Sequence, residues 1–135
     1  MLRPLLIWAL CWPCFASIIN KDRLKTCHPK LIKIVEEVAK YQDVIVLECH
    51  RGKKRQNKLY KEKKTLLKYP RSKHNKNPSQ AVDLVPHPIN WKDIQRLREF
   101  ANFVKGVSIG MGIEILNGGL DWEYFSDYPH YQLKE

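Results

Sequence analysis

Residues 72–86 read SKHNKNPSQAVDLVP, and this stretch decides how we expect the chain to fold. Its first half belongs to a segment at 67–79 that is rich in Pro, Asn, Ser and Lys, a composition typical of a long loop. Its second half, 81–85, is apolar apart from Asp83 and is closed by Pro86, which predicts a strand. The stretch therefore places His74 in a loop and a carboxylate in the strand that leaves it.

Outward from this stretch, apolar residues recur at helical spacing in some segments and form short β-branched runs in others. These patterns predict helices at about 29–41, 53–62 and 90–105, and strands at 44–47, 81–85, 113–116 and 130–133. In the last helix we expect Asn90 as the N-cap, with Trp91 and Ile94 on the apolar face. Helices interspersed with short strands predict an α+β fold, with a small, largely antiparallel sheet and flanking helices.

The chain has 135 residues, which is room for one compact domain, expected at 17–135. Residues 1–16 begin with a basic Met-Leu-Arg and continue as an apolar run, the layout of a short secretory signal. That run is shorter than the roughly 20 residues that span a bilayer, so we expect no stable membrane span. The alternative is an apolar extension that packs on the domain.

The positive charge is concentrated in one segment. The net charge is +10, and residues 51–76 hold twelve basic residues against the single acidic Glu62. Such a segment attracts polyanions, although a merely solvated basic face remains an alternative. Its aromatic residues are only Tyr60 and Tyr69, too few for base stacking, so nucleic acid is not the expected partner.

Four cysteines lie at 11, 14, 27 and 49. Cys11 and Cys14 have the spacing of a redox pair but lack the strand and helix that such a site needs. If residues 1–16 are removed, Cys27 and Cys49 remain and are able to form one disulfide.

Two histidines have carboxylates nearby: His74 with Asp83, and His130 with Asp127. Two imidazoles and one carboxylate are the protein ligands that a catalytic zinc takes, with the fourth position left to water. A second carboxylate close to the metal is able to act as a general base. By spacing alone this metal site is a weak signal, because a chain with five His offers many such combinations.

Three motifs together resemble those of a family of zinc peptidases: Ser72-Lys73-His74, Ala81-Val82-Asp83-Leu84-Val85-Pro86 and Asp127-Tyr128-Pro129-His130-Tyr131-Gln132-Leu133. The family includes D-alanyl-D-alanine carboxypeptidases, vancomycin-resistance dipeptidases and phage L-alanyl-D-glutamate endolysins, and its fold is shared by the Hedgehog signalling domain. Gly118-Gly119, followed by Asp121-Trp122, resembles the phage-type branch, although Leu120 interrupts the usual order.

The resemblance implies a role for each matching residue. The zinc ligands are His74, Asp83 and His130, the general base is Asp127, the oxyanion is stabilised by Arg51, and Ser72 and Gln56 orient substrate or ligands. The base is Asp where the dipeptidases have Glu. Trp91, Trp122 and Phe125 are expected in the core rather than as platforms for sugars.

These residues lead us to expect a Zn²⁺-dependent peptidase that cuts the stem peptide of bacterial peptidoglycan, specifically an L-alanyl-D-glutamate endopeptidase. The alternatives are a D-alanyl-D-alanine carboxypeptidase or dipeptidase with the same site, and a non-catalytic zinc-binding module on the same fold. We expect a monomer that acts at the cell wall or in the periplasm, either exported through residues 1–16 or released from the host cytoplasm at lysis.

Overall fold

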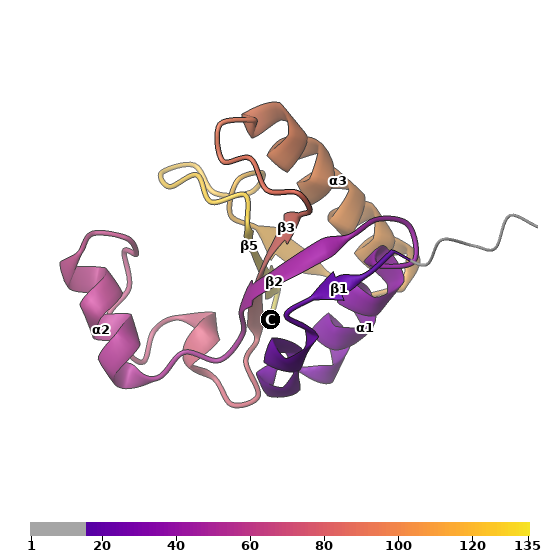
Figure 1. Cartoon of the computed structure of the whole chain (residues 1–135). Coiled ribbons are helices and arrows are strands. Elements are labelled where there is room, and N and C mark those ends of the chain that lie inside the picture. Colours follow the sequence, from indigo (N-terminus) through magenta and orange to yellow (C-terminus); the bar gives the residue numbers. More distant parts are fainter. Residues whose placement is uncertain (1–15) are drawn as a thin grey trace, which may run out of the picture.

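A computed structural model describes residues 16–135 of the chain (Figure 1). The elements follow in the order β1 (Ile18–Ile19), η1 (Lys21–Thr26), α1 (Pro29–Val38), β2 (Val44–Glu48), α2 (Lys53–Lys61), η2 (Lys73–Asn75), β3 (Ala81–Pro86), α3 (Ile94–Gly110), β4 (Ile115–Asn117) and β5 (His130–Leu133), where η marks a 3₁₀ helix. The expected α+β class is confirmed.

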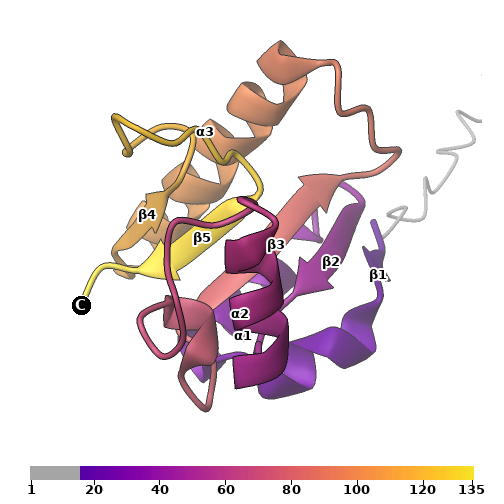
Figure 2. The ribbon, with the colours of Figure 1, turned by 90° about the vertical axis from the view of Figure 1, so that its left-hand side faces the viewer.

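One five-stranded sheet, in the order β1-β2-β3-β5-β4, organises the chain. The pair β1–β2 is parallel and the other three pairs are antiparallel, as expected for a largely antiparallel sheet. Helices α1 and α3 cover one face, and α2 stands on the opposite side, in front of β3 and β5 in Figure 2. The sheet therefore has one face packed against α1 and α3 and an opposite face on the side of α2.

The core lies between the sheet and the two covering helices. In α1 the buried side chains recur at helical spacing, and Pro29 at the first turn begins the helix without losing a backbone hydrogen bond. The side chains of β2 and β3 that meet them are β-branched and almost fully buried, among them Val44, Val46 and Val82. Burial of these apolar faces fixes the sheet on which the polar side chains of the site stand.

Two details differ from the sequence-based expectation. Helix α3 is capped by Asp93, whose Oδ1 accepts a hydrogen bond from the backbone N–H of Arg96 at 3.0 Å, and not by Asn90. Trp91 and Ile94 are 55% and 50% exposed, so they do not extend its buried face. Because Asp93 is the N-cap, the helix begins at Ile94, about one turn later than expected. Residues 91–92 form a turn instead of helix.

Strand β1 and helix η1 were not predicted, because two strand residues and one 3₁₀ stretch are too short to show a period. The expected signal sequence at 1–16 and the pair Cys11 and Cys14 lie outside the described residues, Ala16 apart. Among residues 16–135, no helix is long and apolar enough to cross a membrane.

Candidate functional site: a metal-ligand cluster in a cleft

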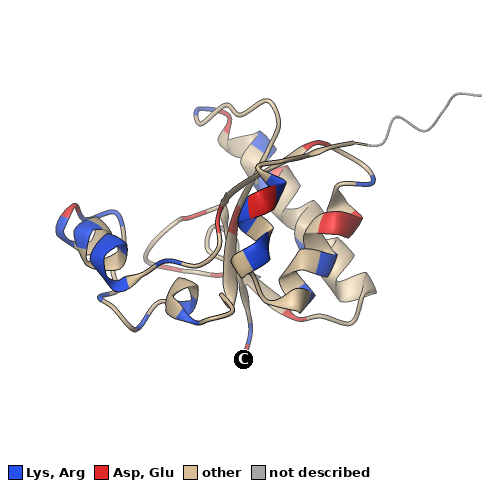
Figure 3. Ribbon diagram, turned by 60° about the horizontal axis from the view of Figure 1, so that its bottom comes forward, with Lys and Arg blue, Asp and Glu red and all other residues tan. Residues whose placement is uncertain are grey.

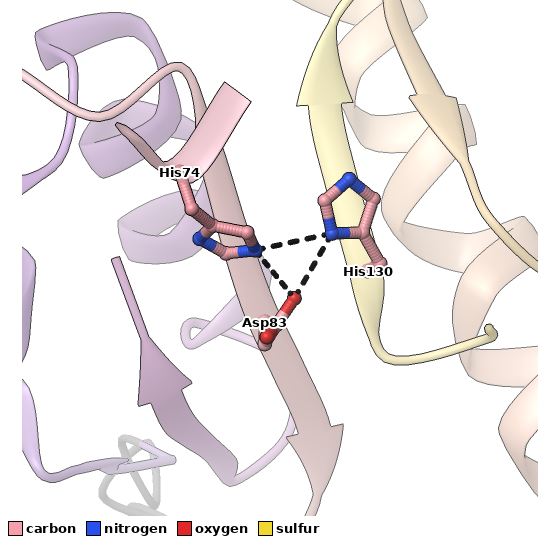
Figure 4. A group of neighbouring side chains, drawn as sticks. All are labelled: His74, Asp83 and His130. Atoms are coloured by element: carbon pink, nitrogen blue, oxygen red, sulfur yellow. Dashed lines mark hydrogen bonds and ion pairs between the residues drawn. The ribbon is translucent and has the colours of Figure 1, made fainter. Parts of the chain in front are cut away.

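Three side chains from three elements converge at one point: His74 from η2, Asp83 from β3 and His130 from the start of β5 (Figure 4). Asp83 and His130 are direct partners in the antiparallel register, so the sheet itself sets their spacing. The Nε2 of His74 lies 3.1 Å from the Nδ1 of His130, and the Oδ1 of Asp83 lies 3.1 Å and 3.2 Å from those two nitrogens. This expected cluster is thus assembled.

In each imidazole, one ring nitrogen faces the cluster and the other, the outer nitrogen, points away from it. Each outer nitrogen lies within hydrogen-bond distance of a carbonyl oxygen. His74 Nδ1 lies 2.6 Å from the backbone oxygen of Cys49, and His130 Nε2 lies 2.9 Å from the side-chain Oε1 of Gln132. Because these oxygens only accept hydrogen bonds, each outer nitrogen carries a proton, and in the neutral ring the inner nitrogen is then left with a lone pair. Two nitrogen lone pairs and one carboxylate oxygen therefore face one another.

Three acceptors at such short distances require a cation or a proton between them. Burial by itself raises the pKa of Asp83, but the charge of His74 and hydrogen bonds with His130 and His74 outweigh it and hold that pKa well below its usual range. Burial lowers the pKa of His130, but the hydrogen bond and charge of Asp83, together with Gln132 and Asp127, outweigh burial and raise that pKa. The cluster is thus suited to hold positive charge, and it is able to bind a metal ion.

Arg51 lies beside the cluster and is 8% exposed. Its guanidinium donates to Glu48 Oε2 at 2.9 Å and to Gln56 Oε1 at 3.1 Å, and it stands 3.6 Å from Asp83 Oδ2. A register shift between Val46 and Glu48 brings Glu48 opposite Asp83 in the β2–β3 pair. Sequence reasoning missed Glu48; the signal available was an acidic residue three positions before the predicted functional arginine.

The two residues expected to orient substrate or ligands have different surroundings. Gln56 is fully buried: its Oε1 accepts from Arg51, and its Nε2 donates to the Leu67 carbonyl at 2.6 Å. Ser72 lines the cleft, and its Oγ accepts a hydrogen bond from the backbone N–H of His74 at 3.2 Å. Both side chains hold other site residues in place.

A cavity of about 610 Å³ lies over the cluster. The segment after α2 supplies one wall with Leu66, Leu67 and Arg71, and the loop before β5 supplies the other. Trp122 and Phe125 belong to that second wall, so the expectation that they lie in the core is wrong. The ring of Trp122 is centred 4.9 Å from the ring of His130, because the loop folds back over the strand that carries this histidine.

Asp127 also lines the cavity, together with the three cluster residues. Burial, and next the negative charge of Asp83, raise the pKa of its carboxyl group. Its position depends on Gly118, where a Cβ atom would lie 2.6 Å from the backbone oxygen of Asp127 and 2.9 Å from its Cβ. The Gly-Gly pair seen in the sequence thus allows the turn after β4 to pack against the segment that carries Asp127.

A disulfide joins Cys27, at the end of η1, to Cys49, at the end of β2. Both cysteines are 2% exposed. The pairing that the sequence allowed is therefore formed, and it lies directly behind His74, whose ring is held by the Cys49 carbonyl.

The basic segment supplies Lys64, Arg71 and Lys73 to the lining of the cleft. Figure 3 shows Lys and Arg side by side along α2 and the chain that follows it. Lys53, Lys54, Lys58 and Lys61 are exposed to solvent. The cleft thus has positive charge along one rim.

Comparison with known proteins identifies the family of the chain. The profile of a family described as phage L-alanyl-D-glutamate peptidase matches residues 15–134. The crystal structure of the L-Ala D-Glu endopeptidase ChiX from Serratia marcescens superposes with a TM-score of 0.73 at 26% identity, covering 84% of this chain and 85% of that one. No curated protein gives a significant match. Since the profile spans the described fold, the chain belongs to the phage L-alanyl-D-glutamate peptidase family.

Proposed function

We propose that this peptidase hydrolyses the bond between L-Ala and D-Glu in the stem peptide of bacterial peptidoglycan, with a zinc ion held by His74, Asp83 and His130. The observation that carries the proposal is the convergence of three acceptor atoms at the floor of a cleft that also holds Asp127 and Arg51. Membership of the family supports the bond assignment.

The donor set fits zinc. Ligand atoms at about 2.0–2.1 Å from a tetrahedral Zn²⁺ lie about 3.3 Å from one another. The three separations in the cluster are 3.1 Å, 3.1 Å and 3.2 Å. When bound, zinc supplies a Lewis acid that polarises the scissile carbonyl and makes the attacking water more acidic.

Asp127 is proposed as the general base. Its carboxylate takes a proton from the attacking water and passes it to the nitrogen of the leaving D-Glu as the amide bond breaks. Burial and Asp83 raise the pKa of Asp127, which makes its carboxylate a better proton acceptor.

Arg51 is proposed to stabilise the negative charge that develops on the carbonyl oxygen. Its guanidinium is fixed by Glu48 and Gln56, so little reorganisation is needed when that charge appears. Gln56 then acts through Arg51, and Ser72 acts through His74, whose backbone it caps.

Action outside the cytoplasm is supported by the disulfide, because such bonds persist in oxidising compartments. Export through residues 1–16 is the proposed route, with release at host lysis as its alternative. The basic rim favours contact with the anionic wall and raises the rate of encounter without selecting the bond. The monomeric state stays a prediction.

Purified peptidoglycan sacculi provide the test. The full chain, loaded with zinc, should expose new amino groups that chemical labelling and hydrolysis identify as D-Glu. A chelated sample should expose none, and added zinc should restore them. Binding of one zinc without any new amino terminus would contradict the proposal and favour the non-catalytic module.

A further inference from the structure

We propose that the Cys27–Cys49 disulfide is a positioning element of the metal site: it holds the Cys49 carbonyl against His74 and thereby sets metal affinity. The inference rests on the proposed function, since His74 must bind the metal. It goes further because it makes the metal affinity of the site depend on the redox state of two cysteines that are not metal ligands.

The Cys49 carbonyl is the direct link. It accepts from His74 Nδ1 at 2.6 Å and from the Ser79 hydroxyl at 3.0 Å. The first of these bonds fixes both the tautomer and the orientation of an imidazole that is 1% exposed. A shift of residue 49 therefore turns the ring whose Nε2 faces Asp83 and His130.

The second link runs from η1 to the loop that carries His74. Cys27 forms an isolated bridge with Ser79, whose backbone N–H donates to the Thr26 carbonyl at 2.8 Å. The Ser79 carbonyl in turn accepts from the His28 N–H at 2.8 Å. One side of the disulfide is thus anchored on the segment that closes the loop after His74.

The third link runs to the arginine. The backbone N–H of Arg51 donates to the His74 carbonyl at 2.8 Å, and the N–H of His50 donates to the Thr26 hydroxyl at 3.2 Å. Residues 26–28, 49–51 and 72–79 therefore meet behind the cluster, and among the described residues the disulfide is the covalent bond that joins two of these segments.

Loss of this bond leaves the end of β2 attached to η1 only by hydrogen bonds and apolar packing. Groups that orient a metal ligand typically change metal affinity by about 10- to 100-fold when they are removed. The oxidised protein should therefore bind metal about 10- to 100-fold more tightly than the reduced protein. The site should reach its full metal affinity only in a compartment where disulfides form.

The test compares the full chain with two disulfide-free variants, Cys27→Ala/Cys49→Ala and Cys27→Ala/Cys49→Val; the latter restores buried volume. Alanine and valine are used because free thiols bind zinc themselves. The matched control is Leu31→Ala, which removes a core side chain of α1 and leaves the disulfide intact. Zinc affinity is measured by competition with a chromophoric chelator, and thermal unfolding shows that each protein is folded.

We expect about 10- to 100-fold weaker zinc binding in the disulfide-free variants and unchanged binding in the control at a comparable loss of thermal stability. The imidazole Nδ1–H signal of His74 should also shift in proton NMR, since its hydrogen bond to residue 49 weakens. Equal affinity in all proteins, an equal loss in Leu31→Ala, or failure of both disulfide-free variants to fold would overturn the inference. Absence of zinc binding by the unmodified chain would instead refute the proposed function.

Discussion

Replacement of Glu48 by Gln tests how the cleft holds its arginine. Glu48 accepts from Arg51 at 2.9 Å and also pairs with Arg55. Burial tends to raise the pKa of Glu48, but hydrogen bonds from Arg55 and Arg51 outweigh it and lower the pKa below the usual 4.5. Glu48→Gln keeps the size and one acceptor oxygen but removes the charge that Arg51 faces.

The cost follows from the exposure of the pair. Loss of one partner of a fully buried ion pair costs about 3–5 kcal/mol. The side chains of Arg51 and Glu48 retain 9% and 15% exposure, and Asp83 lies 3.6 Å from the guanidinium. We therefore expect a loss of about 2 kcal/mol in the free energy of unfolding, with Gln still accepting one hydrogen bond. For a domain of this size that corresponds to about 8 °C in Tm.

The pH dependence has a definite sign. Because the pKa of Glu48 is lower in the folded chain, its stabilising effect is present above the unfolded pKa and is lost as pH falls through the folded one. The Tm difference between the unmodified chain and Glu48→Gln should be largest at neutral pH and shrink below about pH 4. Calorimetry of the full chain across this range provides the measurement.

Arg55→Ala is the matched control. It removes the other partner of Glu48, but the Arg55 side chain is 60% exposed, so we expect a loss of only about 0.5 kcal/mol, or about 2 °C. Equal effects of the two variants, or a Tm difference for Glu48→Gln that does not change with pH, would show that the charge of Glu48 does not hold Arg51 in place.

Three further variants probe the base, the cap and the basic rim. Asp127→Asn should lower kcat by about 10²- to 10⁴-fold without changing zinc affinity, as single-turnover hydrolysis and chelator competition would show; weaker zinc binding would point to a ligand instead. Ser72→Ala removes the hydroxyl that accepts from the His74 N–H and should lower stability by about 1 kcal/mol in denaturant titration, whereas no change would mean that the cap contributes nothing. Lys54→Gln/Lys58→Gln should weaken binding to sacculi at low salt in a sedimentation assay and match the unmodified chain at high salt; a difference independent of salt would argue against an electrostatic rim.

The larger elements were predictable because each has its own local signal. The spacing of apolar residues predicts α1, and the β-branched run predicts β2. The start of α3 was misplaced because Asn90 and Asp93 are both good caps, and the choice between them depends on what is buried, which the sequence does not show.

In the candidate site, too, the features with a local sequence signal were predictable and those that depend on long-range contacts were not. The residues of the cluster were predictable from motifs, whereas their convergence depends on the β3–β5 register, a long-range feature. Glu48 was missed because it faces Asp83 through a register shift in β2, and irregularities of this kind leave no clear mark in a single sequence. Trp122 was misplaced because an aromatic residue in a core and one in a cleft wall have the same local pattern.

Mass spectrometry of the fragments released from purified peptidoglycan shows whether the chain cleaves the bond between L-Ala and D-Glu. With the zinc-loaded chain we predict glycan fragments that end in L-Ala and peptides that begin with D-Glu, both absent after chelation and with Asp127→Asn. Loss of a terminal D-Ala alone, with the L-Ala–D-Glu bond intact, would contradict this prediction and assign the cleft to the carboxypeptidase reaction.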